Sequence, residues 1–270
     1  MQYKLLTGLI MSALSSSVCF GSGLVINQSG DNSSSTVQVN QSNSDLSQIN
    51  SGPYAEVNQF GGASSTAKID QLETDASLAR ITQAGDNQRS DIVQRNVTNA
   101  LANTHQTGSD NQATILQEAT DASSSSNTFA EVNQTGRANT AEISQLDSTN
   151  VNAFIHQTGN SNINKVTQQS AEGSLVHINM SGNANTSESI QENSRHDTSY
   201  ISASGTANRL KSRQGSADHL SENNLMMYRA GGDSNSADLA QYGSNHIMDI
   251  TQNGTSNSVT ICQGNDAACN

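Results

Sequence analysis

The feature that most constrains the fold of this chain is a short repeated pattern, clearest in the stretch Ala130 to Gln145, AEVNQTGRANTAEISQ. Two five-residue runs, AEVNQ and AEISQ, flank the segment TGRANT. In each run alanine, a β-branched residue and glutamine alternate with polar residues, which is the period of a half-buried β-strand. Gly136 stands where a tight turn favours positive φ. The stretch therefore predicts two strands joined by an arc, with one row of side chains directed inward.

The same pattern recurs ten times along the chain, and we call each occurrence a unit. The arc glycines are Gly30, Gly61, Gly85, Gly108, Gly136, Gly159, Gly182, Gly205, Gly232 and Gly254. The glutamines that end the second strand of each unit are Gln41, Gln71, Gln94, Gln117, Gln145, Gln168, Gln191, Gln214, Gln241 and Gln263. The spacing is 23 residues from Gly85 to Gly108, and again from Gly136 to Gly159, Gly182 and Gly205. A fixed period predicts an all-β fold, a parallel β-solenoid of about ten stacked strand-turn-strand units.

The composition argues against several other classes of protein. Only 33% of the 270 residues are hydrophobic and 3% are aromatic, which is too little for a single compact globule of this length. Disordered chains are also polar, but a disordered chain has no need to keep strand alternation in phase. The net charge of −12 disfavours nucleic acid as a partner and suits a soluble exported chain.

The N-terminus, residues 1–21, is predicted to be a secretory signal peptide. Lys4 supplies a positive start, Leu5 to Leu14 is an apolar run, and Ser15 to Cys19 offers small residues for cleavage. The apolar run is too short to span a membrane. A lipoprotein anchor at Cys19 is the alternative. The protein is therefore expected to be secreted and not embedded in a membrane.

Residues 22–263 are predicted to form one solenoid domain, and residues 264–270 a short cysteine-containing tail. Three insertions leave the phase of the units intact: Ser42 to Pro53, Thr120 to Asn127 and Gly215 to Asn224. Once Cys19 is removed with the signal peptide, an oxidising compartment favours a disulfide between Cys262 and Cys269, with two unpaired thiols as the alternative. No cluster of cysteine and histidine accompanies them, so no metal site is expected.

Stacked units would place like residues above one another, about 4.8 Å apart. A buried amide without a partner costs roughly 1–3 kcal/mol, but an amide in a column donates to one neighbour and accepts from the other. Besides the second-strand glutamines, we expect a first-strand column of Gln28, Gln59, Gln83, Gln106, Gln134, Gln157 and Gln252. Met180, Ala203 and Ala230 replace glutamine there in three consecutive units.

Three further columns are expected from the same stacking. The asparagine column, three residues after the glycine, holds Asn111, Asn139, Asn162, Asn185, Asn208, Asn235 and Asn257, with Ser33, Ser64 and Gln88 in the first three units. The apolar column, two residues before the first glutamine, holds Ile26, Val57, Ile81, Thr104, Val132, Ile155, Ile178, Ile201, Tyr228 and Ile250. An outward column alternates in charge from Glu142 through Lys165, Glu188 and Lys211 to Asp238, which favours this register over a slip.

The repeated pattern of these residues resembles that of a known protein family. The pattern Q-x-G-x-x-N-x-A-x-x-x-Q is that of the curlin repeat, found in the subunits of curli, which are extracellular amyloid fibres of bacteria. Gln106 to Gln117 and Gln134 to Gln145 match it at every specified position, and Gln157 to Gln168 and Gln252 to Gln263 depart only at the alanine. The resemblance covers Leu24 to Gln263.

The resemblance implies a secreted structural subunit that crosses the outer membrane unfolded and polymerises into fibres for adhesion and biofilm matrix. Its implied partners are further copies of itself, a nucleator subunit and an outer-membrane export pore. The chain differs from the family in its short leader before Leu24, its larger number of units and its cysteine-containing tail. The rank of the chain, as major subunit, nucleator or accessory, is left open.

The sequence also bears on two other functional classes. A monomeric β-solenoid adhesin or surface-binding protein would have capped ends and would offer the insertions as places to bind its ligand. An enzyme is not expected, because the chain has no GxSxG, HExxH or GGxGxD motif. His105 and His156 occupy equivalent outward positions two units apart, too far to share a metal ion. No catalytic, cofactor-binding or metal-binding residue is therefore predicted.

Overall fold

A computed structural model describes residues 23–29, 35–42, 53–120 and 126–264 of the protein. All secondary-structure elements assigned within these ranges are β-strands. None of the described residues forms a helix with the length and apolarity needed to cross a membrane. The predicted signal peptide and residues 265–270 of the predicted tail lie outside the described ranges.

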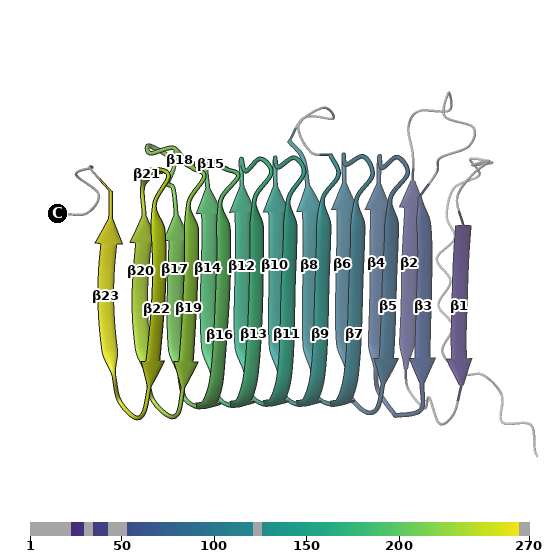
Figure 1. The fold of residues 1–270 in the computed structure, drawn as a ribbon. Coiled ribbons are helices and arrows are strands. Elements are labelled where there is room, and N and C mark those ends of the chain that lie inside the picture. Colours follow the sequence, from purple (N-terminus) through teal and green to yellow (C-terminus); the bar gives the residue numbers. More distant parts are fainter. Residues whose placement is uncertain (1–22, 30–34, 43–52, 121–125, 265–270) are drawn as a thin grey trace, which may run out of the picture.

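The strands form two parallel sheets of ten strands each, stacked face to face along the whole molecule (Figure 1). The first strands of the units make one sheet: β1 (Gly23–Ser29), β3 (Tyr54–Phe60), β5 (Leu78–Ala84), β7 (Leu101–Ser109), β9 (Phe129–Arg137), β11 (Asn152–Asn160), β13 (Leu175–Asn183), β16 (Thr198–Thr206), β19 (Leu225–Gly231) and β22 (Ile247–Asn253). The second strands make the other: β2 (Thr36–Ser42), β4 (Thr66–Leu72), β6 (Arg89–Arg95), β8 (Gln112–Glu118), β10 (Thr140–Leu146), β12 (Ile163–Gln169), β14 (Thr186–Glu192), β17 (Arg209–Gln214), β20 (Ser236–Gln241) and β23 (Ser258–Gln263). The predicted parallel β-solenoid is confirmed.

The register of the strands places like residues opposite one another. In the second sheet Gln117 of β8 pairs with Gln145 of β10, which pairs with Gln168 of β12. In the first sheet Val132 of β9 pairs in the same way with Ile155 of β11. The side-chain period of a strand is two, so a slip of one residue would turn every inward side chain outward. The in-register pairing keeps the predicted glutamine and apolar columns on the inside and the charged column on the outside.

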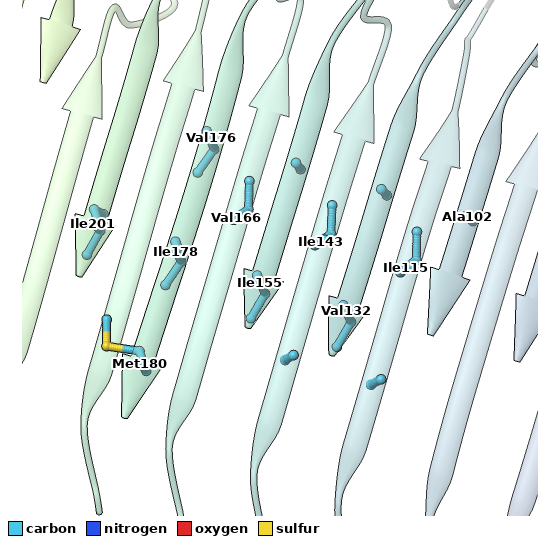
Figure 2. Packing of buried hydrophobic residues seen from close by; sticks show 14 of the residues in the cluster. Ala102, Ile115, Val132, Ile143, Ile155, Val166, Val176, Ile178, Met180 and Ile201 are labelled. Atoms are coloured by element: carbon cyan, nitrogen blue, oxygen red, sulfur yellow. The ribbon is translucent and has the colours of Figure 1, made fainter. Parts of the chain in front are cut away.

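The two sheets pack through a thin core of small and β-branched side chains. Ala130 and Val132 of one sheet and Ile143 of the other are completely or almost completely buried. Figure 2 shows that Ile115, Ile143 and Val166 follow one another from unit to unit between the sheets. Because each unit is covered by the units on either side of it, the stack buries its apolar surface with few large aromatic residues.

A narrow third row of β-bridges lies between each second strand and the next unit. Two-residue strands β15 (Ser194–Arg195), β18 (Ser221–Glu222) and β21 (Gly243–Ser244) form a small sheet, and isolated bridges continue the row back through Glu172, Thr149, Ser126 and Thr98 to Asp75. Strand β18 lies inside the insertion Gly215 to Asn224. Part of this insertion is therefore paired with β15 and β21. This row was not predicted, because its residues share no chemical type.

The arcs bring the glycines of successive units into direct contact. Gly136 has a φ of 121°, and a Cβ atom placed there would lie 2.0 Å from the carbonyl oxygen of Gly159. The same approach recurs at 1.9–2.2 Å along the column from Gly62 to Gly232. Both the positive φ and the close backbone approach exclude a side chain, which explains why glycine recurs in every unit.

In the second unit, the glycine that contacts the next arc lies one residue after the predicted one. Gly62, rather than Gly61, lies against the carbonyl of Gly85, at 2.1 Å from a Cβ position. Gly61 is the extra residue of this arc, and nothing lies within 4 Å of a Cβ atom there. The predicted first member, Gly30, lies outside the described residues.

The extra residue also moves the start of the asparagine column. Ser65, not Ser64, takes that position, and its hydroxyl donates to the carbonyl of Gly85 at 3.0 Å. Ser64 instead lies in the arc with a φ of 60°. The equivalent residue of the first unit is Ser35, whose hydroxyl accepts from the backbone N–H of Ser65. The prediction of Ser33 for this position was therefore wrong, because Ser35 occupies it.

Candidate assembly surface

The second-strand glutamines form one continuous hydrogen-bonded ladder, which we call the second glutamine ladder. Each Nε2 donates to the Oε1 of the next unit at 2.8–3.2 Å, in the order Gln41, Gln71, Gln94, Gln117, Gln145, Gln168, Gln191, Gln214, Gln241 and Gln263. The amides also donate to backbone carbonyls; Gln145, for example, donates to that of Phe129 at 2.9 Å. Burial of these amides is thus compensated in every unit between the two ends.

The first glutamine ladder runs in the same direction but stops part-way. Each Nε2 donates to the next Oε1 at 2.6–3.0 Å, in the order Gln28, Gln59, Gln83, Gln106, Gln134 and Gln157. Met180, Ala203 and Ala230 then occupy the column in successive strands. Gln252 stands beyond this gap in the last unit, and the hydroxyl of Tyr228 donates to its Oε1.

The asparagine ladder runs in the opposite direction. Each Nδ2 donates back to the Oδ1 of the preceding unit at 2.9–3.1 Å, in the order Asn257, Asn235, Asn208, Asn185, Asn162, Asn139 and Asn111. The same Oδ1 accepts a backbone N–H, as Asn111 does from Asn139 at 3.0 Å. The Nδ2 of Asn139 also reaches the carbonyl of Gly159 in the next arc, at 2.8 Å. Asparagine thereby ties each arc to both of its neighbours.

The family model of the curlin associated repeat matches residues 232–264. The chain contains a curlin repeat. The matched stretch begins in the arc of the ninth unit and includes β20, β22 and β23. Strand β20 of this curlin repeat pairs in register with β17 of the preceding unit, and β22 pairs in register with β19. The preceding units therefore stack on the curlin repeat without an offset. None of the curated proteins compared with the chain matches it.

The two ends of the stack that contains the curlin repeat offer different hydrogen-bonding groups. Gln28 and Gln41 donate through Nε2 to the second unit, which leaves their Oε1 atoms at the N-terminal edge. Gln263 accepts from Gln241 through Oε1, which leaves its Nε2 at the C-terminal edge. No described residue uses these leftover groups. The second glutamine ladder therefore begins in an acceptor and ends in a donor.

The predicted alternation of outward charges produces ion pairs between units. Glu142 pairs with Lys165 at 3.0 Å, and Glu188 approaches Lys211 at 3.9 Å. All four side chains are partly exposed to solvent, so each pair contributes only about 0.2–1 kcal/mol. The charges therefore reinforce a register that the inward ladders already set.

An outward row of aromatic rings was not predicted. Phe129, Phe154, His177 and Tyr200 follow one another in successive units, with ring centroids 5.1–6.0 Å apart. Burial lowers the pKa of His177, and the neighbouring His156 adds to this effect. His177 and Tyr200 border a surface groove of about 180 Å³. The described residues contain no group of three or more side chains placed to hold a metal ion.

The cysteine prediction concerns the last strand, β23. Cys262 lies on its outward face and is disulfide-bonded. Cys269, the predicted partner, lies outside the described residues. The disulfide between these two residues therefore stays a prediction.

One buried carboxyl group makes stability depend on pH. Asp197 is fully buried, and its Oδ1 accepts the backbone N–H of Asn224 at 2.8 Å. Burial raises the pKa of Asp197 to about 6, from an ordinary value of 3.8. The folded chain therefore keeps a proton that the unfolded chain releases between these two pH values, so stability falls as pH rises through that window.

Replacing Asp197 by asparagine is expected to remove this pH dependence. Two pKa units correspond to about 3 kcal/mol, so Asp197→Asn should be about 2–3 kcal/mol more stable than the wild type at pH 7 and similar to it near pH 3.5. Denaturant unfolding between pH 3.5 and 8 measures the difference. An unchanged slope between pH 4 and 6 in Asp197→Asn would contradict the assignment.

Proposed function

We propose that this chain is a secreted structural subunit that assembles end to end into extracellular curli-type amyloid fibres, which serve adhesion and the biofilm matrix. The curlin repeat and the parallel β-solenoid both support this role. Strands β1 and β2 at one end, and β22 and β23 at the other, each have a strand partner on one side only among the described residues. Open strand edges of this kind are templates for further strands.

The observation that carries the proposal is the match between the inward residues of the two ends. If the last unit of one copy stacks on the first unit of the next in the observed register, the pairs are Met248 on Leu24, Ile250 on Ile26, Gln252 on Gln28, Val259 on Val37, Ile261 on Val39 and Gln263 on Gln41. Apolar residues meet apolar residues and glutamine meets glutamine at all six positions. A contact between two different ends does not close on itself, and it therefore builds a filament.

The exposure of apolar side chains at the ends supports the same contact. Leu24 at the N-terminal end is 40% exposed and Ile247 at the C-terminal end is 69% exposed. Their counterparts within the stack, such as Ala55 and Leu225, are buried or half-buried by the next unit. Covering both ends with further copies would remove this apolar surface from water. A nucleator subunit and an export pore are the additional partners that we propose on the curlin resemblance.

Quiet incubation of the purified chain tests the proposal directly. We expect fibres that bind an amyloid dye and give an axial diffraction spacing of about 4.7–4.8 Å. A chain that stays monomeric for days, with solution scattering of a rod of fixed length, would overturn the proposal. That outcome would favour a monomeric surface-binding solenoid, for which the outward groove at His177 and Tyr200 is the candidate binding site.

Variants of the last unit locate the contact. Gln252→Ala combined with Gln263→Ala removes two amides that would bond to the next copy, each worth about 1 kcal/mol. We expect end-to-end association to weaken about 30-fold, measured as the critical concentration for fibre growth. Gln169→Ala is the matched control, because Gln169 is exposed on an inner strand, and it should leave the critical concentration unchanged. Equal effects of the two changes would place the contact elsewhere.

A further inference from the structure

Tyr228 is the one aromatic residue in the apolar column of the first sheet. Its neighbours in that column are Ile201 and Ile250, and its ring is buried with 1% exposure. The additional volume of the ring is accommodated where the adjacent glutamine column holds small residues, Ala203 and Ala230. Near the C-terminal end of the stack, the apolar column therefore contains tyrosine in place of isoleucine where the adjacent glutamine column contains alanine.

The hydroxyl of Tyr228 reaches the only glutamine beyond the gap in the first ladder. It donates to Oε1 of Gln252, where the unbroken part of the ladder would place the Nε2 of another glutamine. Burial raises the pKa of Tyr228 to about 12, so the hydroxyl keeps its proton and remains a donor. With Oε1 bound inside the stack, the Nε2 of Gln252 is the group that faces the next unit.

The contact gives the two glutamines of the C-terminal end the same polarity. Gln252 and Gln263 both present Nε2 donors there, whereas Gln28 and Gln41 present Oε1 acceptors at the N-terminal end. Two C-terminal ends brought together would set donor against donor, and two N-terminal ends would set acceptor against acceptor. Only the C-terminal end of one copy against the N-terminal end of another pairs every amide.

The asparagine ladder favours the same head-to-tail contact, although it presents an acceptor rather than a donor at the C-terminal end. Along the ladder each Oδ1 accepts the backbone N–H of the equivalent residue in the next unit, as Asn235 does from Asn257. No described residue donates to Oδ1 of Asn257. In a following copy the equivalent N–H belongs to Ser35, which occupies this column in the first unit.

We propose that Tyr228 is a positioning residue for fibre growth: it holds the Gln252 amide with its donor outward, so that the C-terminal end joins the Gln28 acceptor of a second copy. This inference rests on the proposed assembly function. Without the hydroxyl, the Gln252 amide is free to turn over. A turned amide would place its Oε1 against the Oε1 of Gln28 at the junction, so that two acceptors face each other. The fraction of ends that are competent to bind then falls, and the rate of growth falls with it.

Tyr228→Phe tests the proposal, because it keeps the ring and removes only the hydroxyl. We expect elongation of preformed fibres by the same variant to be about fivefold slower than for the wild type. Tyr200→Phe, which removes a hydroxyl from the exposed face of the same sheet, should elongate at the wild-type rate. Circular dichroism of the monomer should show the same β content for all three proteins.

A double-mutant cycle with Gln28→Met separates positioning from a merely structural role, since Tyr228 can affect Gln28 only through Gln252, across the junction of two copies. Methionine already occupies this column at Met180. Gln28→Met alone should slow elongation, but added to Tyr228→Phe it should slow it less than twofold further. Independent, multiplicative effects would overturn the inference, as would a wild-type rate for Tyr228→Phe. If the wild-type chain forms no fibres at all, the proposed function itself fails.

Discussion

Replacing Gly136 by alanine is expected to destabilise the solenoid by about 4 kcal/mol or more, which is among the largest effects of a single methyl group. The φ of 121° at this position is strained for any residue with a Cβ atom, and that atom would lie 2.0 Å from the carbonyl oxygen of Gly159. The neighbouring backbone would have to move, and the ladder of arcs above and below would move with it. Denaturant unfolding of the monomer gives the change in free energy directly.

Gly61 provides the matched control for this substitution. It also has positive φ, 59°, but a Cβ atom there meets nothing within 4 Å. Gly61→Ala therefore introduces only the intrinsic cost of a left-handed residue, about 1–2 kcal/mol. A similar loss of stability in Gly61→Ala and Gly136→Ala would show that close packing of the arcs is not what requires glycine.

Replacing Gln145 by leucine is expected to cost about 3–4 kcal/mol, although the new side chain is apolar and similar in size. The change leaves Oε1 of Gln168 and the carbonyl of Phe129 without their donor, and it removes the acceptor of Gln117. Each buried polar group that loses its partner costs about 1–3 kcal/mol. The free energy of unfolding of the purified monomer measures the sum.

The same substitution on the outward face serves as the control. Gln169 follows a ladder residue on β12 but is exposed. Gln169→Leu should change stability by no more than about 0.5 kcal/mol. If Gln145→Leu were equally mild, the amide ladder would not be a source of stability, and burial of the glutamines would need another explanation.

The columns of the stack could be predicted because one spacing governs them all. Gln117, Gln145 and Asn139 recur with the arc glycine in phase, and strand alternation fixes which side chains face inward. A single inserted residue was enough to break the count, as at Gly61, because the sequence does not say which of two neighbouring glycines contacts the next arc. The errors were confined to the arcs of the first two units, since the strands on either side restore the register.

Other features could not be predicted, because they depend on direction and contact rather than on spacing. The amides of the glutamine ladders donate toward the C-terminus, and those of the asparagine ladder donate toward the N-terminus. The residue type does not say in which direction its amide donates. Asp110, Ala138 and Ser161 all adopt left-handed backbone conformations before an inward asparagine, yet they share no chemistry. The bond from Tyr228 to Gln252 joins residues from two different columns.

The fold, the ladders and the proposed assembly all require that like side chains lie directly above one another along a single stack. NMR of protein labelled at the glutamine side chains tests it most directly, through contacts between the amide groups of Gln94, Gln117 and Gln145. With amide nitrogen and oxygen atoms 2.8 Å apart in each successive pair, strong contacts are expected from Gln94 to Gln117 and from Gln117 to Gln145. A folded, β-rich protein in which these amides show no mutual contact would contradict the claim.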